Sequence, residues 1–137
     1  VLEIGAGTGN NTAALLDALP CVLTALEPSA GMIAQAQRKA LPCHFLRTSA
    51  TALPFAKGHF DFIFGTYMLH HIQNLHRLFN ECANALGTGC AAFVTVPTDF
   101  IKQQSHTIAL LGHSQQGLSQ VQNVLVNFIQ LAARSCL

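Results

Sequence analysis

The stretch Val1-Leu-Glu-Ile-Gly-Ala-Gly-Thr-Gly9 opens the chain and decides the fold. Its first four residues form an apolar, strand-like run that contains one acid, Glu3. Gly5, Gly7 and Gly9 then alternate with other residues, and a helical pattern follows. Glycines let the backbone turn tightly and approach a ligand closely, because no Cβ stands in the way. The order strand, glycine loop, helix predicts a ligand-binding loop at the start of an α/β domain.

Short apolar runs alternate with helical periods along the rest of the chain, which is typical of a parallel sheet covered by helices on both faces. We expect strands at 1–4, 22–26, 43–46, 60–64 and 90–96. We expect three helices: one capped by Asn10 or Asn11, with Leu15, Leu16 and Leu19 on one face and a stop at Pro20; one capped by Ser29, with Met32, Ile33 and Ala36 inward and Arg38 and Lys39 in its last turn; and one over 75–86, followed by a turn at 87–89.

Length and composition predict a single domain that lacks some of its parts. The chain has 137 residues, of which only 9% are charged and 50% hydrophobic, against roughly 25% charged in an average soluble domain. Because Val1 already lies in a strand, we expect a segment to be missing at the front. Residues 1–97 form the recognisable core, and we expect 98–137 to be a divergent helical tail, with a helical period at 118–133.

Charge and cysteine usage exclude several function classes. The formal net charge is +1 and no cluster of Lys or Arg could neutralise phosphates, so nucleic acid is not an expected partner. No run reaches the ~18 apolar residues of a membrane span. We expect no metal site, since His71 and His76 have no ligand at a suitable spacing. The chain has five scattered cysteines: Cys21, Cys43, Cys82, Cys90 and Cys136. We expect them to be reduced thiols in a cytoplasmic protein, with Cys21 and Cys43 as small core residues.

The spacing of the glycines indicates which ligand the loop takes. A dinucleotide site has the spacing G-x-G-x-x-G, but position 10 is Asn and the observed spacing is G-x-G-x-G. Without a pyrophosphate to bind, the loop suits a smaller ligand such as an amino acid joined to a nucleoside. Glu27, at the end of the second expected strand, can accept hydrogen bonds from both ribose hydroxyls. The alternative is that the glycine turn is only a structural connection.

These residues resemble the class I S-adenosylmethionine-dependent methyltransferases, in particular the "type 11" domains whose small members methylate metabolites. Residues 2–9 resemble the family's glycine motif, and Leu26-Glu27-Pro28-Ser29 followed by Met32 resembles its ribose-binding motif. Ala52-Leu53-Pro54-Phe55, Phe60-Asp61 and Leu69-His70-His71 also match. The resemblance covers residues 1–97. It implies a Rossmann-like, doubly wound and mostly parallel sheet, incomplete at both ends and short by two strands, with S-adenosylmethionine as cofactor.

The resemblance also assigns roles to single residues. It implies that Glu27 holds the ribose and that Thr66 lines the pocket near the methionine moiety. Ser49 stands where the family usually has an Asp for the adenine amino group, which implies weaker binding. The full set of implied cofactor-binding residues is Glu3, Gly5, Ala6, Gly7, Gly9, Glu27, Pro28, Met32, Ser49, Ala50 and Thr66.

Catalytic residues are not identified by the sequence. Methyl transfer from a sulfonium chiefly needs in-line placement of the acceptor, and a base helps when the acceptor is a hydroxyl or a protonated amine. His71, His70 and Tyr67 are candidates, although the Leu-His-His run also suits packing beneath a loop. Two functions remain open: a methyltransferase acting on a small-molecule or lipid-like acceptor, and a truncated cofactor-binding remnant that acts as a non-enzymatic module. The oligomeric state is not indicated.

Overall fold

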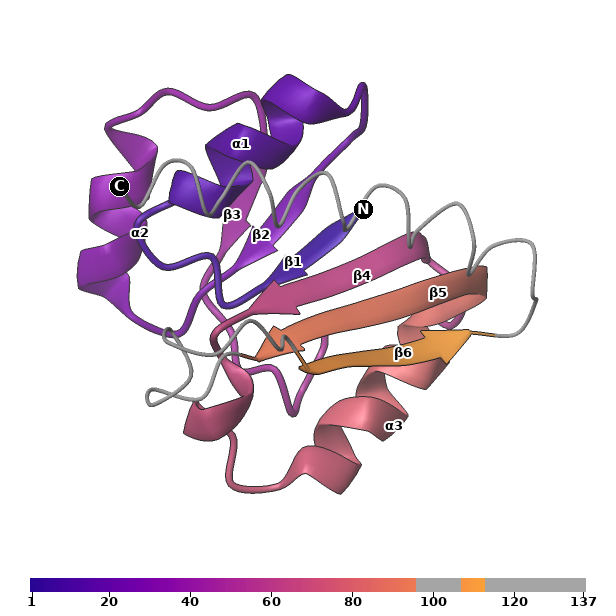
Figure 1. Ribbon diagram of the computed structural model, residues 1–137. Helices are drawn as coiled ribbons and strands as arrows, with labels where there is room; N and C mark the ends of the chain where they lie inside the picture. Colours follow the sequence, from indigo (N-terminus) through magenta and orange to yellow (C-terminus); the bar gives the residue numbers. More distant parts are fainter. Residues whose placement is uncertain (96–106, 113–137) are drawn as a thin grey trace.

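The structure, a computed structural model, describes residues 1–95 and 107–112. Their framework is a six-stranded sheet with the order β3-β2-β1-β4-β5-β6 (Figure 1). Strands β1 to β5 pair in parallel, and β6 pairs antiparallel with β5. The strands are β1 (Leu2–Ile4), β2 (Thr24–Leu26), β3 (His44–Leu46), β4 (Phe60–Thr66), β5 (Leu86–Thr95) and β6 (Thr107–Gly112). The predicted α/β fold with a mostly parallel sheet is confirmed.

Helices cover both faces of this sheet. They are α1 (Asn10–Ala18), α2 (Ala30–Gln37) and α3 (Leu75–Ala85), and a short 3-10 helix, η1 (Leu69–His71), follows β4. Figure 1 shows α1 and α2 on one side of the sheet and α3 on the other. Each of the first two helices links a strand to the next parallel strand, so the glycine loop and the loop after β2 meet at one edge of the sheet.

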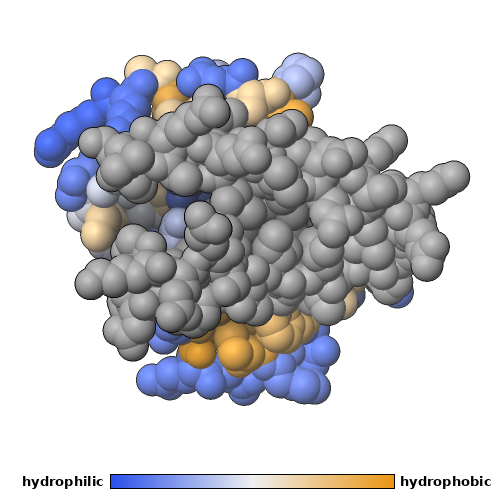
Figure 2. Space-filling view, in the orientation of Figure 1, coloured by the Kyte–Doolittle hydropathy of each residue, from blue (hydrophilic) through white to orange (hydrophobic). Residues whose placement is uncertain are grey.

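Two apolar clusters hold the layers together. Leu15 of α1 packs with Leu23 and Phe64 on one face of the sheet, and Cys21 and Cys43 pack against this cluster as predicted. On the other face, Leu78 and its neighbours on α3 pack on β1, β2 and β4. At the edge by α3, Figure 2 shows a rim of hydrophilic residues with apolar residues just inside it. Strand β1 is buried on both faces, as the central position requires.

The helix ends confirm one predicted cap and correct another. Ser29 caps α2, since its Oγ accepts a hydrogen bond from the Met32 amide at 3.3 Å. The predicted cap of α1 by Asn10 or Asn11 is wrong: Gly9 is the N-cap, and both asparagines lie inside the helix. Their side chains bond elsewhere, Asn10 to Lys39 and Asn11 to Thr66. Because both residues lie inside the helix, neither can be its N-cap.

Two further expectations for α2 are wrong. The helix ends at Gln37, so Arg38 is the C-cap and Lys39 lies beyond it rather than in the last turn. Met32 was expected inward but is 42% exposed, whereas Ile33 and Ala36 are buried. A helix of eight residues has a narrow buried stripe, and Ile33 and Ala36, three residues apart, fill it.

The largest differences lie after α3. The predicted turn at 87–89 is wrong, because β5 begins at Leu86, directly after the helix. Phe60 pairs with Leu86 and Phe62 pairs with Cys90, so the register of the two strands shifts at this point. The predicted tail without strands is also wrong, because β6 lies at 107–112. The helical period predicted at 118–133 lies outside the described residues. Within the described part of the chain, no helix is long and apolar enough to cross a membrane.

Candidate functional site

The glycine loop between β1 and α1 is built on three left-handed residues. Gly5, Gly7 and Gly9 have φ values of 77°, 56° and 79°, a region that side chains rarely adopt. The amides of Gly5 and Ala6 both donate to the Leu26 carbonyl of β2, each at 2.9 Å. The loop is thus tied to the carboxyl end of the neighbouring strand, and Glu27 comes directly after that point.

Glu27 fastens the middle of the same loop. Its Oε2 accepts a hydrogen bond from the Gly7 amide and its Oε1 accepts one from the Ser29 amide, both at 2.9 Å. The side chain is only 9% exposed. A carboxylate offers about four acceptor positions, so two remain for a ligand. The arrangement lets one acid shape the loop and face the space beside it.

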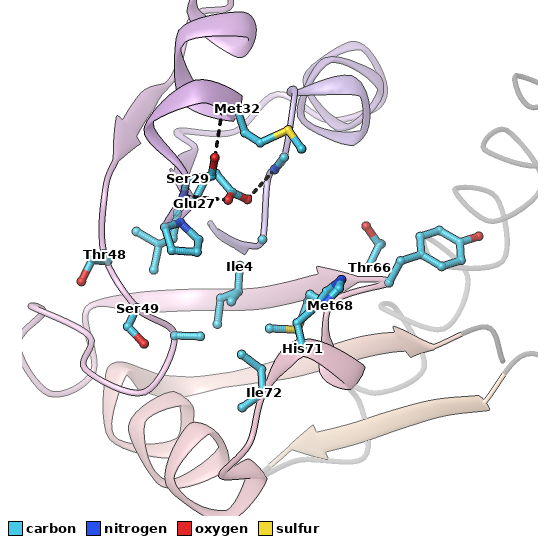
Figure 3. A pocket seen from close by; sticks show the side chains of 16 residues that line it. Ile4, Glu27, Ser29, Met32, Thr48, Ser49, Thr66, Met68, His71 and Ile72 are labelled. Atoms are coloured by element: carbon cyan, nitrogen blue, oxygen red, sulfur yellow. Dashed lines mark hydrogen bonds between the residues drawn. The ribbon is translucent and has the colours of Figure 1, made fainter. Parts of the chain in front are cut away.

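That space is a cavity of about 470 Å³ at the carboxyl ends of β1, β2 and β4 and beside the loop that follows β3. Figure 3 shows Glu27, Ser29 and Met32 on one side of it, Thr48 and Ser49 at one end, and Thr66 towards the other. Ligands of open α/β sheets bind at this edge. The lining residues are Ile4, Gly5, Gly7, Leu26, Glu27, Pro28, Ser29, Met32, Thr48, Ser49, Ala50, Thr66, Tyr67, Met68, His71 and Ile72.

The structure brings most of the predicted site residues to this cavity. Met32 is exposed from α2 because it faces the cavity rather than the core. Their contacts with a cofactor stay predictions. The predicted residues that line the cavity are Gly5, Gly7, Glu27, Pro28, Met32, Ser49, Ala50, Thr66, Tyr67 and His71; those that do not are Glu3, Ala6, Gly9 and His70.

Glu3 is buried beneath α1 instead. It is 1% exposed, its Oε2 accepts a hydrogen bond from the Thr12 hydroxyl at 2.5 Å, and its Oε1 has no hydrogen-bond partner in the described structure. Burial raises the pKa of this carboxyl to about 7, although the Thr12 hydrogen bond works in the opposite direction. The bond spans the glycine loop, joining the strand before it to the helix after it.

The end of β4 forms the wall opposite Ser49. Thr66 is 9% exposed and its Oγ1 accepts a hydrogen bond from Asn11 Nδ2 at 2.5 Å. The next residue, Tyr67, has a φ of 54°, which is a rare conformation for a bulky side chain. This turn brings Met68 back under the glycine loop, where a Cβ on Gly5 would lie 2.9 Å from the Met68 Cβ. Backbone strain of this kind gathers at binding and catalytic sites.

Two histidines follow this turn. The imidazole rings of His70 and His71 have centroids 3.9 Å apart, but only His71 lines the cavity. His71 is therefore the better placed of the two to act on a ligand, and Tyr67 lies beside it in the lining.

Several lining residues were missed by the sequence reasoning. Thr48, Met68 and Ile72 carry no motif, and Ser29, although part of the ribose-binding motif, was predicted to cap the helix and not to line the site. The signal that could have found Met68 is Gly65: a Cβ there would lie 3.1 Å from Met68 Sδ and from the Ile4 carbonyl. Ser49 is less free than expected, since its Oγ hydrogen bonds to the Thr51 hydroxyl at 3.0 Å.

The lining of the cavity carries a single carboxylate and leaves open space beside the glycine loop. Among the lining residues, Glu27 is the one carboxylate and no Lys or Arg contributes. Gly7 faces open space, because a Cβ there would meet no atom within 4 Å. Within the described residues no three potential metal ligands gather. A polar ligand whose hydroxyls can donate to Glu27 fits this lining.

Comparison with known proteins agrees with this geometry. Residues 1–89 match the methyltransferase domain family. The chain is 29% identical over 104 residues to a malonyl-[acyl-carrier protein] O-methyltransferase of Enterobacter lignolyticus, covering 75% of this chain and 41% of that protein. It is 36% identical over 73 residues to a demethylmenaquinone methyltransferase of Beutenbergia cavernae, covering 53% of this chain and 30% of that protein.

A solved structure has the same fold. The geranyl diphosphate C-methyltransferase of Streptomyces coelicolor, in complex with Mg²⁺, geranyl diphosphate and S-adenosyl-L-homocysteine, superposes with a TM-score of 0.64 at 19% identity. The match covers 69% of this chain and 38% of that one. The chain thus spans less than half the length of each of these three proteins.

Proposed function

Since this chain belongs to the methyltransferase domain family, we propose that its cavity binds S-adenosylmethionine and that the protein transfers the cofactor's methyl group to a small-molecule acceptor. The observation that carries the proposal is Glu27, which fastens the glycine loop through Gly7 and keeps acceptor positions towards the cavity. Two of the relatives named above have small acceptors or acceptors on a carrier, which supports a small-molecule substrate.

The walls suggest how the cofactor would be held. The two ribose hydroxyls would donate to Glu27, which as a carboxylate is an acceptor only. The adenine would lie beside Pro28 and Met32, with its edge towards Ser49 and Ala50, and the amino-acid end would reach the glycine loop and Thr66. The bound cofactor supplies an activated methyl group on its sulfonium. The chain's own contribution is then to fix the position of the acceptor and to exclude water.

His71 is the candidate for proton transfer within this proposal. It lines the cavity, whereas His70 does not. A neutral imidazole can take a proton from a hydroxyl or an ammonium acceptor as the methyl group arrives. An acceptor that carries no such proton would not need it, so the role of His71 depends on the acceptor.

The test is a calorimetric titration of the chain with S-adenosylmethionine and with S-adenosylhomocysteine. We expect micromolar binding, which Glu27→Ala weakens by about 1–3 kcal/mol because polar partners lose their bonds. Glu81→Ala is the matched control: Glu81 also accepts a backbone hydrogen bond, from Leu53 at 3.0 Å, but lies outside the cavity.

The control variant should bind as the wild type does. Circular dichroism of both variants separates a binding defect from unfolding. Absence of binding by a folded wild-type chain would contradict the proposal and leave the non-enzymatic module as the reading of this chain.

A further inference from the structure

Thr66 accepts a hydrogen bond from a residue outside the cavity, and this leaves its own proton uncommitted. The Asn11 side chain, in the first turn of α1, donates to Thr66 Oγ1 at 2.5 Å. A hydroxyl has one proton and two lone pairs, so accepting from Asn11 leaves the proton available. Within the part of the chain that the structure describes, the Thr66 hydroxyl donates to no protein acceptor. Since Thr66 is 9% exposed and lines the cavity, the proton can be used there.

The place of Thr66 along the sheet edge indicates what it would meet. The sheet order β3-β2-β1-β4 sets the end of β3, with Ser49, farthest from the end of β4, with Thr66. Glu27 and the glycine loop lie between them, as Figure 3 shows for Glu27. A ligand whose diol binds Glu27 therefore has one end near Ser49 and the other near Thr66.

The charges of the walls decide which group suits the Thr66 end. Glu27 repels a carboxylate, so a negatively charged group should lie away from it. No Lys or Arg is among the lining residues to receive such a group. The buried Thr66 hydroxyl still has its proton to donate, so it is a suitable partner for such a group, since hydrogen bonds to charged groups are the stronger ones.

We propose that Asn11 is a positioning residue that turns the Thr66 hydroxyl proton into the cavity, where Thr66 donates to the carboxylate at the amino-acid end of the cofactor. The proposal rests on the proposed function, because it takes the ligand to be an amino acid joined to a nucleoside. Asn11 acts only through Thr66. Its own amide stays outside the lining of the cavity.

The experiment reverses the direction of this hydrogen bond without changing the size of the Asn11 side chain. In Asn11→Asp the side chain can only accept, so it draws the Thr66 proton away from the cavity. We expect the affinity for S-adenosylhomocysteine, measured by calorimetry, to fall about tenfold. The affinity for 5′-methylthioadenosine, which keeps the nucleoside but lacks the amino-acid end, should change less than twofold.

Asn10→Asp is the matched control, because it adds the same charge one residue away. Asn10 is exposed and accepts a hydrogen bond from Lys39, and neither residue lines the cavity, so this variant should bind both ligands as the wild type does. Thr66→Ser should keep the affinity, and Thr66→Val should lose about as much as Asn11→Asp. In the Thr66→Val background, Asn11→Asp should cost less than twofold, because the two changes remove one interaction.

Two results would overturn the inference. One is an Asn11→Asp effect that is equal with and without the Thr66 hydroxyl, which would mean that the added charge acts directly. The other is an equal loss for both ligands, which would mean that the loop as a whole has moved. Both differ from failure of the proposed function, in which the wild-type chain itself does not bind S-adenosylhomocysteine.

Discussion

Gly5 and Gly7 share a left-handed backbone but differ in their surroundings. A Cβ on Gly5 would lie 2.9 Å from the Met68 Cβ, a contact that real side chains do not make, whereas a Cβ on Gly7 would meet nothing within 4 Å. Gly5 is needed for packing as well as for its φ of 77°. At Gly7 the backbone conformation is the main requirement, together with the open space that a ligand would use.

Alanine at these two positions should therefore have different effects on stability. We expect Gly5→Ala to lower the free energy of unfolding by about 2–4 kcal/mol, since strain and a clash add, and Gly7→Ala to lower it by about 1 kcal/mol. Urea denaturation at equilibrium measures both. Gly7→Ala should still weaken the binding of S-adenosylhomocysteine, because its methyl group enters the cavity. Equal losses of stability would contradict the assignment of the Met68 contact.

The packing of α3 can be tested by comparing two leucines of this helix that differ in burial. Leu78 is fully buried against the sheet, whereas Leu75, one turn earlier, is 40% exposed. Leu78→Ala should cost about 2–5 kcal/mol of unfolding free energy because it leaves a cavity in the core, and Leu75→Ala should cost under about 1 kcal/mol. Thermal or urea unfolding of the two variants checks the difference. Similar losses would mean that the helix packs by another face.

The elements that could be predicted from the sequence are those with a local signal. The capping hydroxyl of Ser29 predicts the start of α2, and the apolar run at 60–64 predicts β4. Strand β6 was not predicted, because its short apolar run at 108–111 is flanked by Gln, Ser and His and pairs with β5 only in the folded chain. Likewise Glu27 was predicted to face a ligand from its motif, but its bond to the Gly7 amide appears only in the folded chain.

At the scale of the whole molecule, the central strand β1, whose carboxyl end forms part of the cavity, carries a buried acid. Glu3 lies on β1 between β2 and β4 and is 1% exposed. The hydrogen bond from Thr12 does not by itself compensate for the loss of water around a charged carboxylate. Only global unfolding exposes such a residue, so its protonation is linked to the stability of the entire domain.

The pH dependence follows from the direction of this shift. Burial raises the pKa of Glu3 from 4.5 to about 7, so the folded chain binds the proton more tightly than the unfolded chain. Its contribution to stability is thus fully present below pH 4.5 and is lost as the pH rises through 7, by about 3 kcal/mol in all. Glu3→Gln cannot titrate and keeps the size of the side chain. The difference in unfolding free energy between wild type and this variant, measured by urea denaturation from pH 4 to 8.5, should turn steadily against the wild type between about pH 4.5 and 7 and then level off. A difference that is constant with pH would mean that folding leaves the pKa of this carboxyl unchanged, and a difference that turns in favour of the wild type would mean that the charged form has a partner.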